Sequence, residues 1–317
     1  MIVKILKTAP GFPGVRYNTN KVDRNTGELM KVSGFGALQV LQNLRPQDYI
    51  NYLRLVSSVN KRIEKPQFHV VLSAKGNTYD KRQLTAIASL WMEEMGYGQQ
   101  PYLVVFHKDT GNNHVHLVTT RIGKDGKKIN SAFENLRAIS SLNKVLGYDA
   151  ALQYQFSTRA QFYLLLENMG YLGRDLNDQQ LEKHLAGYVP DKARIAELKA
   201  LLWAQKEKPE FTQTLARHFQ VELIFHSSEG KRPYGYTILD HQTKQVFKGS
   251  EVLSLKYLMG DWTEPAGTAK GDRSGAELMT SNDAAYVGPI WIAGDIDDEA
   301  ILGRNRQRKK KARTNTR

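Results

Sequence analysis

The sequence QPYLVVFHKDTGNNHVHLVTTRI, residues 100–122, carries the clearest structural pattern in the chain. It contains two apolar runs rich in β-branched residues, 100–107 and 113–122, separated by a short polar segment. Such runs are typical of strands, and the glycine and asparagines between them are typical of a hairpin turn. The stretch therefore predicts a β-hairpin.

Histidines gather on this hairpin, which holds three of the eight in the chain. Side chains alternate along a strand, so His114 and His116 point to the same face. A turn centred on KDTGNN places His107 opposite His114, with Cβ atoms about 5 Å apart. Imidazole nitrogens bind a metal ion at about 2.0–2.1 Å, so the spacing predicts a three-histidine site with open coordination positions. Geometry alone favours zinc, and the ligand type also suits manganese, nickel, cobalt or copper.

The segments before the hairpin predict the rest of the fold. Residues 66–75 alternate like a strand, and residues 80–98 carry a continuous apolar face at helical spacing. Strand, long helix, strand, strand predicts an α+β fold with helices packed on an antiparallel sheet. Residues 46–60 predict a further helix, whereas residues 1–36, rich in glycine and turn residues, are expected to form loops and short pieces.

Later segments predict a second, smaller α+β region followed by an unstructured end. Residues 132–205 are helical in pattern, and residues 222–252 read as strands and hairpins after a short helix. The expected organisation is a main domain at 1–155, a smaller α+β region at 156–262, a disordered linker at 263–303 and a basic tail at 304–317.

Composition narrows the class of protein. The chain has 317 residues, a net charge of +13 and no cysteine, which excludes disulfide scaffolds, cysteine-ligated zinc and thiol nucleophiles. The tail RNRQRKKKARTNTR carries eight of the basic residues and no acidic residue. This pattern is typical of a solvated, disordered end and also of an arm that binds phosphates. Nothing resembles a signal peptide or the roughly 20 apolar residues of a membrane span, so a cytoplasmic protein with a polyanionic partner is expected.

Two further residues are candidates for supporting the histidines. His69 lies on the strand before the long helix, where it is expected to contact a metal ligand or the substrate; a metal ligand and a plain surface residue are the alternatives. Asp109 follows His107 by two residues and is a candidate acceptor for a ring N–H, or a turn-capping residue.

The segment HKDTGNNHVHLV resembles the three-histidine signature of the HUH endonucleases. More narrowly, it resembles the mobilisation relaxases of plasmids and conjugative elements, including those of Bacteroides-type mobilisable elements. The segments VRYNTNKV, FHVVLSA and MGYG occur in the order typical of these relaxases. The resemblance covers about residues 10–150 and implies an HUH-like fold.

The resemblance also implies a chemistry. Tyr17 is expected to attack a phosphodiester at an origin of transfer and form a 5′-phosphotyrosine, while His107, His114 and His116 hold Mg²⁺ or Mn²⁺; zinc stays open. Its partners are expected to be single-stranded and supercoiled DNA, accessory mobilisation proteins and a coupling protein. A metal on the phosphate would offset its charge, and a tyrosine of pKa about 10 needs help to ionise.

Basic residues in two places suit contacts to DNA phosphates. One group surrounds Tyr17, and the other forms a turn, RIGKDGKK, expected near the metal face. The candidates are Arg16, Lys21, Arg24, Arg121, Lys124, Lys127 and Lys128.

Three other functions fit parts of the pattern. A rolling-circle replication initiator uses a similar hairpin, but often places its tyrosine after the histidines. A non-catalytic DNA-binding accessory protein would use the histidines for structural zinc. A water-using metal phosphoesterase would form no covalent adduct.

Overall fold

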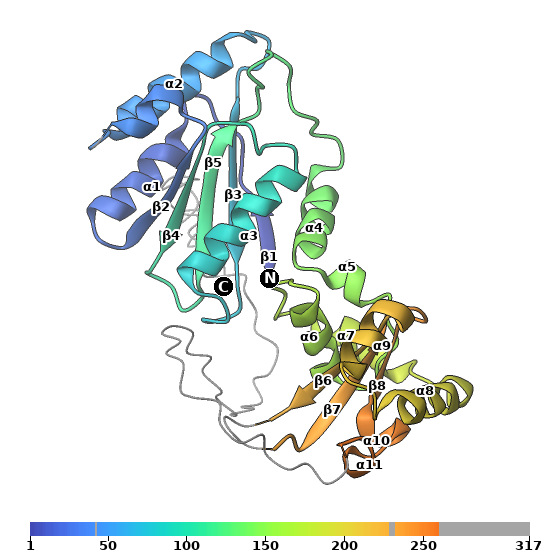
Figure 1. Cartoon of the computed structure of the whole chain (residues 1–317). Helices are drawn as coiled ribbons and strands as arrows, with labels where there is room; N and C mark the ends of the chain where they lie inside the picture. Colours follow the sequence, from blue (N-terminus) through green and yellow to red (C-terminus); the bar gives the residue numbers. More distant parts are fainter. Residues whose placement is uncertain (42, 228–231, 260–317) are drawn as a thin grey trace, which may run out of the picture. The chain divides into compact units, whose positions relative to one another are not determined.

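The computed structural model describes residues 1–41, 43–227 and 232–259 (Figure 1). The described residues pack as two compact units that divide between Val189 and Pro190. The expected linker at 263–303 and basic tail at 304–317 lie outside the described residues. Within the described part, no helix has the length and apolar character to cross a membrane.

A five-stranded antiparallel sheet forms the centre of the first unit, with the strand order β1-β3-β5-β4-β2. Its strands are β1 (Ile2–Ile5), β2 (Gly27–Ser33), β3 (Gln67–Ser73), β4 (Tyr102–His107) and β5 (His114–Thr120). Every residue of β3, β4 and β5 is buried, as expected for inner strands covered on both faces. The β4–β5 hairpin pairs His107 with His114, which confirms the predicted register.

Helices cover both faces of this sheet (Figure 1). On one face lie α1 (Pro13–Asp23) and α2 (Pro46–Ser58), whose apolar side chains pack on Leu103 and Val118. On the other lies α3 (Lys81–Glu94), which begins at the N-cap Asp80. A short 3₁₀ helix, η1 (Gly36–Val40), follows β2. The predicted α+β class is therefore confirmed.

The expectation of loops across residues 1–36 is wrong, because this segment forms β1, α1 and β2. Helix α1 begins at Pro13 and buries polar residues as well as apolar ones, which hides the helical period. Asn18 and Thr19 are buried, and their side chains donate to the carbonyls of Gly14 and Val15 one turn earlier. In β2, a register shift between Leu29 and Lys31 interrupts the alternation that identifies a strand.

Four helices complete the first unit: α4 (Glu134–Val145), α5 (Tyr148–Ala151), α6 (Arg159–Asn168) and α7 (Asp178–Ala186). The indole N–H of Trp91 donates to the carbonyl of Ala138, which fastens α3 to α4. The hydroxyls of Tyr79 and Tyr148 donate to Asp175, so the segment after α6 belongs to the same unit. Packing therefore continues past residue 155, and a functional division there stays a prediction.

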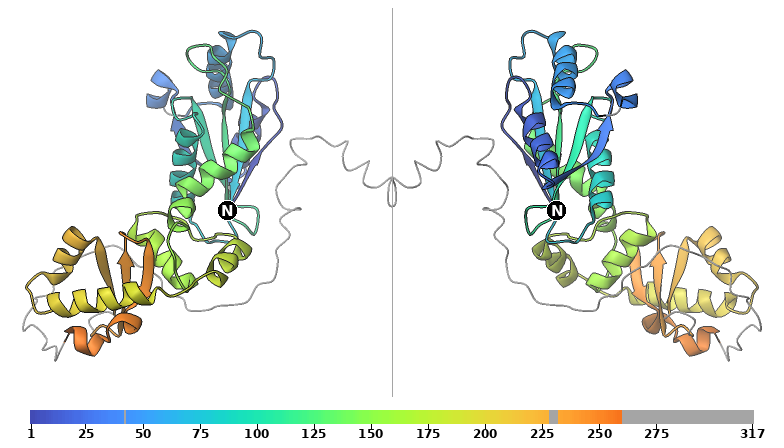
Figure 2. Two further views of the ribbon diagram at one scale, coloured as in Figure 1. Left: turned by 90° about the vertical axis from the view of Figure 1, so that its right-hand side faces the viewer. Right: turned by 90° about the vertical axis from the view of Figure 1, so that its left-hand side faces the viewer.

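The second unit combines a three-stranded antiparallel sheet with helices (Figure 2). Its elements are α8 (Lys192–Gln205), α9 (Phe211–Phe219), β6 (Val221–His226), β7 (Gly235–Asp240), β8 (Gln245–Lys248), α10 (Gly249–Val252) and α11 (Leu255–Met259). Leu198, Leu215 and Ile238 are fully buried in one core. The predicted helix followed by hairpins is confirmed.

Candidate active site

Three histidines meet on the α1 face of the sheet. His107 ends β4, and His114 and His116 lie on β5, so backbone pairing fixes their spacing. One ring nitrogen of each lies within 4.8 Å of the corresponding nitrogens of the other two. The rings of His107 and His116 stack with centroids 4.0 Å apart. All three are buried, and the predicted cluster is confirmed.

Hydrogen bonds set the protonation of His116. Asn18 Nδ2 lies 3.4 Å from His69 Nε2, which in turn lies 2.9 Å from His116 Nδ1. An amide nitrogen only donates, so His69 Nε2 accepts from it and from the proton on His116 Nδ1. His116 therefore presents an unprotonated Nε2, which is buried and has no hydrogen-bond partner.

The other two rings are held in the same manner. His114 Nδ1 lies 3.0 Å from the carbonyl oxygen of Asn112, to which it donates, so Nε2 is the unprotonated nitrogen. His107 Nε2 lies 2.8 Å from Asn18 Oδ1 and donates to it, so the unprotonated nitrogen is Nδ1. Each neutral ring therefore has one nitrogen with the lone pair that metal coordination requires.

The cluster fits a divalent metal ion. Two nitrogens that bind one ion at about 2.1 Å lie at most about 4.2 Å apart, so the cluster is only slightly wider than an ion requires. Burial, and the repulsion that a protonated His107 would exert, hold the pKa of His116 well below its ordinary value. Burial likewise lowers the pKa of His69 to about 3. Both rings are therefore neutral near neutral pH, the form in which histidine binds metals.

Tyr17 lies beside the cluster. Its ring centroid is 5.7 Å from that of His107 and 5.8 Å from that of His116. Lys21 places its ammonium 5.6 Å from the centre of the tyrosine ring. Tyr17 and Lys21 are one helical turn apart and share the face of α1 that looks onto the histidines. The structure thus brings the predicted tyrosine and the predicted metal ligands together.

A close approach of α1 to β3 makes this arrangement possible. The backbone N–H of Gly14 donates to Gln67 Oε1 at 2.7 Å. A Cβ atom on Gly14 would lie 2.8 Å from His69 Nδ1 and 2.9 Å from Gln67 Oε1, closer than carbon contacts allow. Glycine at this position therefore lets α1 pack closely on β3, one turn before Tyr17.

Of the two predicted supporting residues, His69 contacts the cluster through His116. Asp109 does not take the predicted part of orienting His107: it forms an ion pair with Lys21, and Asn18 holds the imidazole instead. The physical reason is that α1 passes over the face of the sheet and brings an amide next to His107, while Asp109 lies in the turn after β4.

Asn18 and Gln67 are site residues that the sequence reasoning missed. Both are buried and both join α1 to the central strands. The signal was present in the spacing, because Gly14, Tyr17, Asn18 and Lys21 stand at i, i+3, i+4 and i+7 of a helix that begins at Pro13.

The predicted DNA-contacting residues fall into two groups. Arg16 and Arg24 are exposed on α1 and at its end, near Tyr17. The turn with Lys124, Lys127 and Lys128 is exposed too. Its expected position near the metal face is wrong, because it follows the end of β5 that lies opposite to His114.

Arg121 differs from the other basic residues because it is buried. Its guanidinium forms two hydrogen bonds with Glu134, at 2.5 and 2.8 Å. It also stacks over the ring of Phe68 at 4.7 Å. About five residues separate His116 from Arg121, which corresponds to about 17 Å along the strand.

Comparison with known proteins agrees with this geometry. Residues 17–148 match the family model described as "Relaxase: MobA/VirD2-like, nuclease domain". The match begins at Tyr17 and includes the whole histidine hairpin and the strands on either side of it. No curated protein matches the chain. Residues 17–148 are therefore similar to the nuclease domain of MobA/VirD2-like relaxases, and their buried histidine triad is consistent with an HUH relaxase.

Proposed function

We propose that the protein nicks and rejoins one DNA strand at an origin of transfer, through a covalent bond to Tyr17, and so initiates mobilisation of a plasmid or integrative element. The observation that carries the proposal is the position of Tyr17, whose ring lies within 6 Å of two of the three clustered histidines. A nucleophile and a site for a divalent ion are thus close enough to act on one phosphate.

The proposed reaction is a transesterification. The phenolic oxygen of Tyr17 attacks the phosphorus of the scissile diester, and the bond from phosphorus to the 3′ oxygen breaks. Tyrosine loses its phenolic proton, and the leaving 3′ oxygen takes up a proton to become a hydroxyl. The product is a 5′-phosphotyrosine, which keeps a phosphodiester bond, so the free 3′-hydroxyl can reverse the step and rejoin the strand.

His107, His114 and His116 would hold the divalent ion. When bound, the ion offsets negative charge on the phosphate and in the transition state. Family resemblance supports Mg²⁺ or Mn²⁺, while the all-imidazole ligand set supports zinc. Asn18 and His69 keep the rings in place through hydrogen bonds to His107 and His116.

Lys21 assists Tyr17 in this proposal. Its ammonium lies 5.6 Å from the centre of the tyrosine ring, where positive charge favours the phenolate. The ion pair with Asp109 fixes the position of the ammonium. The exposed Arg16 and Arg24 on the same helix would contact phosphates near the scissile bond.

Single-stranded DNA, exposed in a supercoiled origin, is the proposed substrate. We also propose that the region at 156–262 binds DNA or partner proteins, among them accessory mobilisation proteins and a coupling protein. Deleting residues 190–262, which start at the boundary of the second unit, should weaken origin binding and spare cleavage of a short single-stranded oligonucleotide; loss of that cleavage too would count against a separate role.

A gel assay for a covalent adduct tests the proposal. The protein is mixed with Mg²⁺ or Mn²⁺ and single-stranded oligonucleotides that tile the DNA beside its own gene. A protease-sensitive shifted band is expected, absent in Tyr17→Phe and His114→Ala and retained in the control Tyr234→Phe, which alters an exposed tyrosine of the second unit.

Three other outcomes would contradict it. Nicking without an adduct, retained in Tyr17→Phe, would indicate a water-using phosphoesterase. Neither product, from protein that keeps zinc, would indicate a non-catalytic DNA-binding protein. An adduct that forms only with replication-origin DNA would indicate a rolling-circle initiator.

A further inference from the structure

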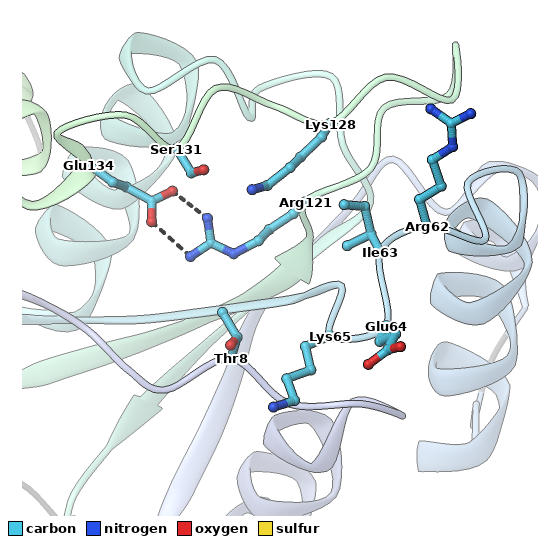
Figure 3. A pocket seen from close by; sticks show the side chains of 9 residues that line it. All are labelled: Thr8, Arg62, Ile63, Glu64, Lys65, Arg121, Lys128, Ser131 and Glu134. Atoms are coloured by element: carbon cyan, nitrogen blue, oxygen red, sulfur yellow. Dashed lines mark hydrogen bonds and ion pairs between the residues drawn. The ribbon is translucent and has the colours of Figure 1, made fainter.

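A basic pocket lies at the end of β5 that is opposite to the histidine end (Figure 3). Its volume is about 450 Å³, and it lies within the first unit. Segments far apart in sequence line it: the chain after β1, the chain before β3, and the segment from β5 to α4. The residues that matter here are Thr8, Arg62, Lys65, Arg121, Lys128 and Ser131.

Positive charge is in excess in this pocket. Four of its lining residues are basic and two, Glu64 and Glu134, are acidic. The charge of Glu134 is paired, because its carboxylate accepts hydrogen bonds from both terminal nitrogens of Arg121. Lys65 and Lys128 are exposed and extend along the pocket wall in Figure 3, on either side of the Arg121 guanidinium. The pocket therefore suits an anion.

Arg121 supplies an independent sign that a ligand belongs here. It is only 5% exposed, and its terminal nitrogens are fixed by Glu134. Its Nε–H is nevertheless buried without a hydrogen-bond partner, and Arg121 is one of the residues that line the pocket. Buried donors normally have partners, so an unpartnered one in a pocket wall indicates an acceptor supplied by a bound molecule. A phosphate oxygen is such an acceptor.

An exposed aromatic residue stands next to the pocket. Phe133 is 79% exposed and lies between the lining residues Ser131 and Glu134. Its backbone φ is +48°, which is unusual for a residue with a side chain and uncommon for phenylalanine. The surrounding structure holds the ring outward instead of burying it, and aromatic rings in this setting stack on nucleic-acid bases.

We propose that this pocket binds a backbone phosphate of the single-stranded DNA substrate, while Phe133 stacks on an adjacent base. The inference rests on the proposed function for the identity of the strand. Lys65, Lys128 and the Arg121 Nε–H contact the phosphate, with Thr8 and Ser131 as neutral donors. Arg121 lies about 17 Å along the strand from His116, on the α3 face of the sheet where it contacts Phe68, so the pocket would hold the DNA several nucleotides from the nick site, where the strand passes the end of the sheet.

Binding of a fluorescent oligothymidine of about 20 nucleotides to the full-length protein, measured by anisotropy over a range of salt, tests the proposal. The double variant Lys65→Ala/Lys128→Ala should bind at least about tenfold more weakly at low salt. Its slope of log affinity against log salt should fall by about 0.7, the value for one phosphate on a single strand. Phe133→Ala should weaken binding by about fivefold or more with an unchanged slope.

A matched control removes the same charge elsewhere on the first unit. Lys144→Ala/Lys183→Ala alters two exposed lysines that do not line the pocket. Equal losses in the two double variants would overturn the proposal, as would an unchanged affinity in Phe133→Ala. The proposal would also be overturned if oligothymidine bound equally to wild type and to Lys65→Ala/Lys128→Ala while millimolar inorganic phosphate occupied the pocket. That result would assign the pocket to a free anion.

The adduct assay separates this proposal from the proposed function. If the pocket variants weaken oligothymidine binding and no Tyr17 adduct forms with wild-type protein, the phosphate pocket stands and the transesterase proposal fails. If the adduct forms and depends on Tyr17 while pocket variants bind like the control, only the pocket proposal fails.

Discussion

Replacing Gly14 with alanine should displace Tyr17 with little effect on the rest of the fold. An added Cβ would lie 2.8 Å from His69 Nδ1, against an ordinary contact of 3.4 Å or more, so α1 must move by at least about 0.6 Å. Neither neighbour yields easily. His69 is held by Asn18 and His116, and Gln67 is buried and hydrogen bonded to the Gly14 backbone.

The effect on rate and the effect on stability should differ. Misplacing a reacting group by about 1 Å costs up to about a hundredfold in rate, so adduct formation by Gly14→Ala should slow by roughly tenfold to a hundredfold. Overpacking costs about 1–3 kcal/mol of folding free energy, and alanine regains about 1 kcal/mol over glycine within a helix. The net loss of stability should therefore be about 2 kcal/mol or less.

Single-turnover adduct formation and urea unfolding measure these two quantities on the same protein. Asn20→Ala is the control, because Asn20 is exposed on α1 and gains similar helix propensity without a new contact. A wild-type rate of adduct formation in Gly14→Ala would refute the claim that the close approach of α1 to β3 positions the tyrosine.

Three further predictions concern the metal, pH and the buried core. His114→Ala should lose the bound ion that wild-type protein retains, as measured by metal analysis after dialysis. The metal-free protein should lose stability as pH falls from about 6.5 toward 3, by up to about 1.4 kcal/mol per pH unit for His69. The reason is that the pKa of His69 is lowered to about 3 in the folded state, so over this range the unfolded chain binds a proton that the folded protein does not. Urea titrations at several pH values measure this dependence, and His69→Gln should flatten it. Glu134→Ala should cost about 3–5 kcal/mol of unfolding free energy by leaving buried Arg121 unpaired, and an unfolding midpoint equal to wild type would contradict the structural importance of this pair.

The hairpin was predictable because its signals are local. Alternation fixes which residues share a face, and the glycine and asparagines fix the turn, so the pairing of His107 with His114 follows from neighbours in sequence. The helix at 80–98 was equally predictable, since Leu84, Ile87 and Trp91 form an uninterrupted apolar face and Asp80 caps the N-terminus of the helix.

Helix α1 was not predictable from apolar spacing, and the prediction of the site residues was therefore incomplete. Its buried face carries Asn18, which hydrogen bonds to His107 of β4, and Thr19, whose hydroxyl donates to the carbonyl of Val15 within α1. Sequence spacing therefore does not identify Asn18 as the partner of His107, and it offers Asp109 as a candidate acceptor or a turn-capping residue. The predicted position of the basic turn was wrong for a related reason. Because β5 is an extended strand, residues that are close in sequence lie at its opposite ends, so Lys128 is far from the histidines.

Mapping the covalent adduct shows directly whether Tyr17 is the nucleophile. The protein is reacted with its origin strand, the DNA is trimmed by nuclease, and the proteolytic peptides are analysed by mass spectrometry. The expected product is a nucleotide joined through a 5′-phosphate to the peptide that contains Tyr17. An adduct on any other tyrosine, or cleaved DNA whose 5′-phosphate is never attached to protein, would contradict it.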